Sequence, residues 1–120
     1  MFDTPNVITL TQDNFEAEVL NSPVPVVVDF WAPWCGPCPV MNRVVAELAA
    51  EFDGLVRVGK VNIDEWENLA RQYHIEAIPT LLIFDRGEVR DRISGLMHKP
   101  ALFDRINTSI EPVSISDKAA

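Results

Sequence analysis

The chain has 120 residues, enough for one domain with a single buried core, and 48% of them are apolar, as in ordinary globular proteins. Its formal net charge of -8 repels phosphate backbones, so we expect no nucleic-acid partner. No stretch reaches the roughly 18 apolar residues of a membrane span, and the first residues lack the pattern of a secretory signal, so we expect a cytoplasmic protein that binds no membrane.

Strand-like and helix-like patterns alternate along the chain. A first strand is predicted at residues 7–10, followed by a helix that Thr11 or Asp13 caps and that runs to about Leu20. The second strand, 24–31, is apolar at successive positions, which is typical of a central strand covered on both faces. Apolar residues at three- and four-residue steps then predict a helix over 35–52, which Asp53-Gly54 ends.

The second half of the chain continues this alternation. A strand at 56–63 and a short helix at 65–73 come first, and strands at 80–84 and 88–94 flank the hairpin signal Asp85-Arg86-Gly87. A last helix at 100–110 carries one apolar stripe. Because strands that alternate with helices pair in parallel and the hairpin pairs antiparallel, we predict an α/β domain over 1–110 in the order β-α-β-α-β-α-β-β-α. Residues 111–120 are expected to form a flexible tail.

The two cysteines of the chain stand three residues apart, in Cys35-Gly36-Pro37-Cys38. A structural disulfide across so short a loop would stabilise the fold by only about 2 kcal/mol. A zinc site would need two further ligands, and His74 and His98 lack the paired spacing of a zinc module. Both alternatives stay open, but the spacing and the strand–helix context favour redox chemistry.

The position of the pair assigns a role to each sulfur. Between a buried strand and the start of a long helix, unpaired N–H groups and the helix dipole lower the pKa of a thiol. We therefore expect Cys35, at the mouth of the helix, to be the exposed attacking thiolate and Cys38, one turn further, to be the shielded resolving thiol. Gly36 permits a tight turn, and Pro37 needs no N–H partner in the first helical turn.

Four motifs follow one another along the chain: Val28-Asp29-Phe30-Trp31-Ala32-Pro33, Trp34-Cys35-Gly36-Pro37-Cys38, Ala77-Ile78-Pro79-Thr80-Leu81 and Gly95. In their order and spacing they resemble the thioredoxin family, from about Val7 to Ile110. The resemblance implies a thioredoxin fold, with a central mixed β-sheet flanked by helices on both faces. It also implies reversible reduction of protein disulfides at Cys35 and Cys38, without a bound cofactor.

Asp29 lies inside the apolar strand, where burial would raise its pKa, although a place at the strand end in contact with water is the alternative that the residues leave open. The resemblance implies that this Asp is buried behind the cysteines and accepts the proton of the second thiol through water. It implies in addition that Lys60 approaches Asp29, whereas Lys60 read alone would be an ordinary solvated strand residue.

The bond between Ile78 and Pro79 would be trans by the general preference of such bonds. The resemblance reverses this expectation and implies a cis proline beside the cysteine pair. It further implies a docking surface that recognises extended target segments by backbone pairing. The residues of this docking surface are Trp34, Gly36, Pro37, Ala77, Ile78, Gly95 and Leu96.

Three places depart from the family pattern. Pro39 stands where relatives commonly have a basic residue, and Arg43 stands where many have a proline. The pair Glu76-Ala77 stands where they commonly have a basic residue followed by glycine. Gly36-Pro37 lacks the histidine of oxidising and isomerising relatives, so we expect a reductant. The expected partners are disulfide-containing target proteins and a thioredoxin reductase, with an NADPH-dependent enzyme expected and a ferredoxin-linked one left open, and the chain is expected to be a monomer. An oxidase or isomerase outside the cytoplasm and a non-redox binding module are the alternatives.

Overall fold

A computed structural model describes residues 6–110, so the tail predicted at 111–120 lies outside the described residues. Five strands form one sheet in the order β1-β3-β2-β4-β5. The strands are β1 (Val7–Thr9), β2 (Val26–Trp31), β3 (Arg57–Asn62), β4 (Thr80–Asp85) and β5 (Glu88–Ser94). The helical segments are η1 (Glu16–Leu20), α1 (Cys38–Glu51), α2 (Glu67–Gln72) and α3 (Lys99–Ile110). The predicted order of elements is confirmed.

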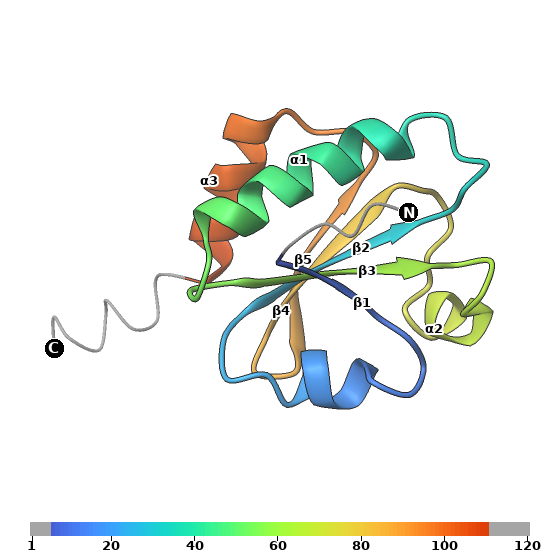
Figure 1. Ribbon diagram of the computed structural model, residues 1–120, viewed down its shortest axis with the longest axis horizontal. Coiled ribbons are helices and arrows are strands. Elements are labelled where there is room, and N and C mark those ends of the chain that lie inside the picture. The colour runs from blue at the N-terminus through green and yellow to red at the C-terminus, as the bar shows by residue number, and fades with distance from the viewer. Residues whose placement is uncertain (1–5, 111–120) are drawn as a thin grey trace, which may run out of the picture.

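The sheet is mixed, as predicted. Strand β3 pairs in parallel with β1 and with β2, while β4 pairs antiparallel with β2 and with β5. Helices α1 and α3 cover one face of the sheet, and α2 and η1 cover the other (Figure 1). No helix among residues 6–110 is long and apolar enough to cross a membrane.

Strand β2 lies at the centre of the sheet and is buried from Val26 to Phe30, which confirms the interpretation of its apolar run. Side chains alternate between the faces of a strand. Val27 accordingly packs into the core under α1 and α3, whereas Val26, Val28 and Phe30 pack into the core over η1 and α2. The same alternation turns Asp29 toward α1, on the face of Val27.

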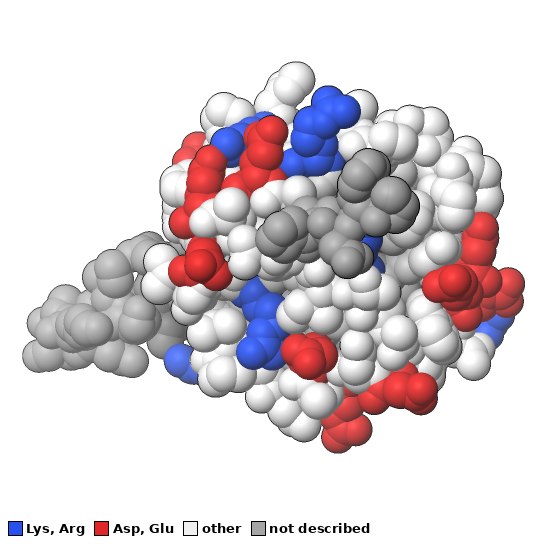
Figure 2. Space-filling view, in the orientation of Figure 1, with Lys and Arg blue, Asp and Glu red and all other residues white. Residues whose placement is uncertain are grey.

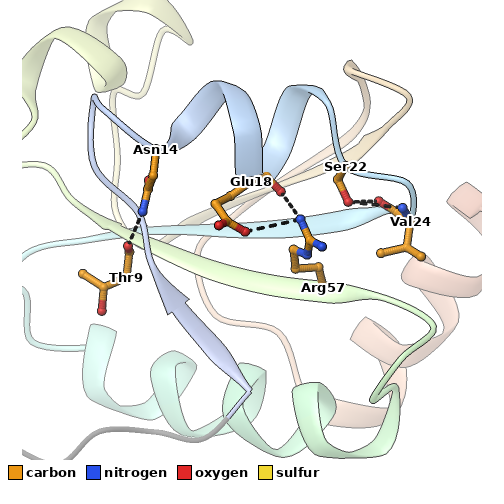
Figure 3. Close-up of polar contacts among 6 residues, drawn as sticks. All are labelled: Thr9, Asn14, Glu18, Ser22, Val24 and Arg57. Atoms are coloured by element: carbon orange, nitrogen blue, oxygen red, sulfur yellow. Dashed lines mark hydrogen bonds and ion pairs between the residues drawn. The ribbon is translucent and has the colours of Figure 1, made fainter.

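Three hydrogen bonds of Thr11 and Asn14 close the connection from β1 to η1. The Thr11 hydroxyl accepts from the backbone N–H groups of Asp13 and Asn14, each at 3.2 Å, and the Asn14 side chain accepts from the Thr11 N–H at 2.7 Å. Thr11 rather than Asp13 therefore closes the turn that leads into η1, while the residue directly before η1, Phe15, makes no side-chain capping bond. The Asn14 amide also donates to the Thr9 carbonyl oxygen at 3.0 Å (Figure 3).

Further contacts hold η1 against the sheet and shape the turn that follows it (Figure 3). Arg57 at the start of β3 donates to the Glu18 carbonyl oxygen at 2.9 Å and to its carboxylate at 3.3 Å. The Ser22 hydroxyl donates to the Val24 carbonyl oxygen at 2.7 Å and accepts from the Val24 N–H at 3.2 Å. These bonds fix the turn that leads into β2, and so they fix the strand that carries Asp29.

The β4–β5 hairpin and α3 complete the sheet edge. Arg86 and Gly87 have φ angles of 55° and 80°, and two positive φ angles in a two-residue loop are the mark of a type I′ turn. Arg105 of α3 binds the Asp91 carboxylate of β5 with two bonds of 2.7 Å. This guanidinium holds the pKa of Asp91 below its ordinary value.

Gly59 on β3 generates a prediction about packing. A Cβ atom there would lie 2.5 Å from Leu10 Cδ1 and 2.8 Å from Leu10 Cγ, and Leu10 is buried. Gly59→Ala is therefore expected to lower the free energy of unfolding by about 1–3 kcal/mol through overpacking. In a Leu10→Ala background the cost should shrink, because the colliding atoms are gone. Urea unfolding of the two single variants and the double variant measures both costs, and strictly additive costs would contradict the account.

Candidate active site

The connection from β2 to α1 carries the cysteine pair. The Cys35 N–H donates to the Ala32 carbonyl oxygen at 3.2 Å, which closes a turn at the end of β2. The Pro37 carbonyl oxygen accepts from Val40 and Met41 at 3.2 and 3.3 Å, so Pro37 caps the helix. The prediction that the helix starts at residue 35 is therefore wrong, because 35–37 form the turn before it and α1 begins at Cys38.

Cys35 and Cys38 are joined by a disulfide, with their Cα atoms 5.4 Å apart. Cys38 is 0% exposed and Cys35 is 5% exposed. The expectation of an exposed Cys35 is wrong for this oxidised form, because its side chain packs with Cys38, Ala32 and Ile78. The predicted ranking is correct, since Cys35 is the more accessible of the two.

The sulfurs lie at the positive end of α1. Cys38 is the first residue of the helix, and the disulfide holds the Cys35 sulfur one bond away from the Cys38 sulfur. The first turn of α1 carries no acidic side chain that would oppose a thiolate. Pro39 lies in this turn and has no N–H to offer, so the helix favours a thiolate through its remaining N–H groups and its dipole.

Asp29 is 0% exposed, which excludes the alternative of a strand-end carboxylate in contact with water. Its neighbours in register are Lys60 on β3 and Leu81 on β4. Burial raises the pKa of Asp29 from 3.8 to about 7, and the charge of Lys60 acts in the opposite direction. Among the described residues, its Oδ1 atom has no hydrogen-bond partner.

Lys60 is partly buried rather than fully solvated. Its ammonium lies 5.2 Å from the centre of the Trp31 ring, a distance at which a cation is attracted to the ring face. Lys60 lies opposite Asp29 in the strand register, and its positive charge lowers the pKa of Asp29. Trp31 is half-buried, packs against the cysteine cluster and offers its ring face to this lysine.

Two loops lie beside the cysteine pair. The Ile78–Pro79 bond is cis, as the resemblance implies. Ile78 packs against the cysteines, and Ala77 next to it is exposed. The Gly95 N–H donates to the Pro79 carbonyl oxygen at 2.8 Å, and Gly95 has a φ of 89°, a conformation that favours glycine. This bond joins the loop after β5 to the loop before β4.

The rest of the predicted docking surface is exposed and largely apolar. Trp34 is 67% exposed and Leu96 is 52% exposed. Gly36 and Pro37 are exposed between the cysteines. The Trp34 indole N–H donates to Asp64 Oδ1 at 3.0 Å, which ties the ring to the segment before α2.

The border of this surface is acidic. Asp64, Glu65 and Glu67 line one hollow beside α2. Figure 2 shows acidic side chains gathered over α2, at the end of the molecule where β2 passes into α1. Glu76, one of the departures from the family pattern, is exposed next to Ala77. This border therefore carries negative charge beside the exposed apolar residues.

Sequence reasoning missed two residues that contact the site. Asp64 holds the Trp34 indole, and the Asn42 side chain reaches both Asp29 and the Cys38 backbone. Asp64 follows a strand end and gave no signal of its own. Asn42 stands four residues after Cys38, a spacing that places both on one face of a helix, and this could have singled it out.

The arrangement supports dithiol–disulfide exchange without any added group. In the described part of the chain, no cluster of three or more His, Cys, Asp or Glu side chains is placed to hold a metal ion. The redox-active group is the cysteine pair itself. A buried carboxyl whose pKa is near neutrality lies on the strand beneath it and can exchange protons at physiological pH.

Asp29→Asn is expected to stabilise the oxidised protein at about pH 8 and to change its stability little at about pH 4. The pKa of Asp29 in the folded state, about 7, lies above its ordinary value of 3.8, so stability is lost as the pH rises through the folded-state pKa. Each pH unit between the two pKa values corresponds to about 1.4 kcal/mol, so ionised Asp29 lowers the free energy of unfolding by on the order of 4 kcal/mol. Urea unfolding at both pH values measures the gain, and an equal gain at both would contradict this account.

Comparisons with known proteins agree with the geometry. The thioredoxin family model matches residues 6–108. The thioredoxin of Rickettsia felis is 46% identical over 101 residues, which cover 84% of this chain and 96% of that protein. Thioredoxin 1 of Nostoc sp. is 50% identical over 93 residues, which cover 78% of this chain and 87% of that protein. The chloroplastic M-type thioredoxin of Spinacia oleracea is 49% identical over 94 residues, which cover 78% of this chain and 52% of that protein. The chain belongs to the thioredoxin family and is a thiol–disulfide reductase whose redox-active disulfide is Cys35–Cys38.

Proposed function

We propose that the reduced chain passes two electrons to disulfides of target proteins and is reduced again by a thioredoxin reductase that uses NADPH. The observation that carries the assignment of roles is the difference in accessibility at the start of α1, where Cys35 is 5% exposed and Cys38 is 0% exposed. Cys35 keeps some exposure and Cys38 keeps none, which favours attack on an incoming disulfide through Cys35. Cys35 is therefore the attacking sulfur, and Cys38 is the resolving sulfur.

The exchange takes two steps. The Cys35 thiolate attacks one sulfur of the target disulfide, forms a mixed disulfide with it and releases the other target sulfur as a thiolate. Deprotonated Cys38 then attacks the Cys35 sulfur, forms the Cys35–Cys38 disulfide and releases the second target thiolate. The target gains the two electrons that the dithiol loses, and the released thiolates take up protons from the solvent.

Asp29 is the base that takes the proton of Cys38. A pKa of about 7 leaves a large fraction of the carboxyl group ionised at neutral pH, which suits a general base. Lys60, opposite Asp29 in the strand register, favours the carboxylate and limits the rise of the pKa that burial causes. Both residues thus act on the second step rather than the first.

Target segments dock in extended form beside the disulfide. Ile78 packs against the cysteines, and its backbone, followed by cis Pro79, pairs with the target main chain. Trp34 and Leu96 supply exposed apolar area. Gly36, Pro37, Ala77 and Gly95 complete the docking surface with small or compact groups, so that main-chain pairing rather than a side-chain code selects the target.

Membership of the family implies a reductase and disulfide-containing proteins as partners. We place the protein in the cytoplasm as a monomer. Both cysteines of the chain belong to the redox pair, and a reducing compartment keeps such a pair available as a dithiol. A monomer leaves the docking surface free. Because an M-type chloroplastic thioredoxin is among the relatives, a ferredoxin-linked reductase is the competing electron donor.

The roles of the two sulfurs predict which variant traps a target. Cys38→Ser is expected to accumulate mixed disulfides through Cys35, because the resolving thiol is gone, whereas Cys35→Ser should trap none. Non-reducing electrophoresis after incubation with a disulfide-containing protein, followed by mass spectrometry of the adduct, identifies the attached cysteine. Trapping by Cys35→Ser alone would reverse the assignment.

The proposed donor and direction predict turnover with NADPH. The protein should reduce a disulfide-containing protein when NADPH and a thioredoxin reductase are supplied, and a ferredoxin–thioredoxin reductase should support less turnover. Its reduction potential should be more negative than the about -180 mV of protein disulfide isomerase. The potential follows from equilibration with glutathione or dithiothreitol buffers. A more positive potential would favour an oxidase or isomerase instead.

A further inference from the structure

The side-chain amide of Asn42 lies between Asp29 and the first turn of α1. One terminal atom of this amide is 2.6 Å from Asp29 Oδ2 and 3.2 Å from the Cys38 carbonyl oxygen. Both neighbours are acceptors, so the atom that faces them is the nitrogen, and the Asn42 amide donates one hydrogen bond to each. The bond to Asp29 is short, as is typical of a donor that faces an ionised carboxylate.

The position of Asn42 follows from the helix and the strand together. It stands four residues after Cys38 in α1, so its side chain lies over the Cys38 carbonyl group. Asp29 reaches the same place from β2, because strand alternation turns it toward the α1 face of the sheet. One half-buried amide thus contacts the buried base and the backbone of the residue that carries the resolving thiol.

We propose that Asn42 is a positioning residue for the second step of the exchange: its amide holds Asp29 Oδ2 and leaves Oδ1 to take the proton from the Cys38 sulfur. The inference rests on the proposed function, in which Asp29 is the base. The proton passes from Cys38 to Asp29, the Cys38 sulfur attacks Cys35, and the bond between Cys35 and the target breaks with release of the target thiolate. Oδ1 is the carboxylate oxygen without a partner among the described residues.

The groups that face Asp29 come from three elements. Strand β3 contributes the Lys60 charge, strand β4 contributes the apolar Leu81, and α1 contributes the Asn42 amide, which also contacts the Cys38 backbone. Lys60 and the amide both favour the carboxylate, while burial favours the neutral acid. Loss of the amide removes one interaction that favours the ionised carboxylate. The pKa of Asp29 should therefore rise.

Asn42→Ala tests the inference in the full-length reduced protein. The carbon-13 NMR titration of the Asp29 carboxyl group should move up by about one pH unit, since each unit corresponds to about 1.4 kcal/mol and a hydrogen bond to a charged group contributes about that much or more. The rate of the second step, followed as release of a preformed mixed disulfide, should shift its acid-side midpoint by the same amount. Asn107→Ala, the same substitution in α3, is the matched control and should move neither.

A double variant separates positioning from general loosening of the helix. In an Asp29→Asn background the Asp29 carboxyl group is absent, so adding Asn42→Ala should leave the pH profile unchanged. An unmoved Asp29 titration in Asn42→Ala would overturn the inference. A moved titration with an unmoved rate profile would also overturn it, and would remove Asp29 as the base. In that case continued trapping by Cys38→Ser would show that the exchange itself is unaffected.

Discussion

A cysteine forms a reactive thiolate at neutral pH only where its surroundings stabilise the negative charge of the sulfur. In this chain the positive N-terminal end of α1 provides that stabilisation. It lies near both sulfurs because the chain turns sharply between β2 and α1. The Ala32 carbonyl oxygen closes that turn with the Cys35 N–H, and Pro37 caps the helix immediately before Cys38. The reactivity of the pair is therefore a consequence of how one strand passes into one helix.

The second constraint is a conflict between folding and chemistry in β2. A central strand covered on both faces should contain only apolar side chains, yet Asp29 occupies its α1 face at 0% exposure. Burial raises its pKa to about 7, so at neutral pH the carboxyl group is poised between its two forms. The same desolvation that makes the ionised group unfavourable for stability makes it able to take and return a proton. The charge of Lys60 on β3 opposes this rise of the pKa, and the Asn42 amide of α1 donates a hydrogen bond to Asp29 Oδ2.

Short sequence patterns predicted those features of the fold that depend on only a few neighbouring residues. The apolar run of β2, the Arg86-Gly87 turn and the amphipathic stripe of α1 each reflect a period or a backbone preference that is visible within a few residues. The cysteine spacing likewise identified the reactive centre. The cis bond at Pro79 and the approach of Lys60 to Asp29 came from the family resemblance, because both depend on contacts between distant segments.

Other features depend on tertiary contacts, and the residues alone did not reveal them. The start of α1 shifted to Cys38 because the Pro37 carbonyl oxygen is the first helical acceptor, which side-chain periodicity does not report. The contacts of Asn42 with Asp29 and of Asp64 with Trp34 join segments that are far apart in the chain. The low exposure of Cys35 similarly results from packing against Ile78, a residue of another loop.

The central claim is that the start of α1 makes Cys35 reactive while Cys38 stays shielded. The most direct measurement is the pH dependence of alkylation by iodoacetamide in the reduced protein, with the modified cysteine identified by mass spectrometry. Cys35 should react first, with a midpoint clearly below the roughly 8.5 of an unstructured thiol, and Cys38 should react slowly. Equal reaction of both cysteines with a midpoint near about 8.5 would contradict the account.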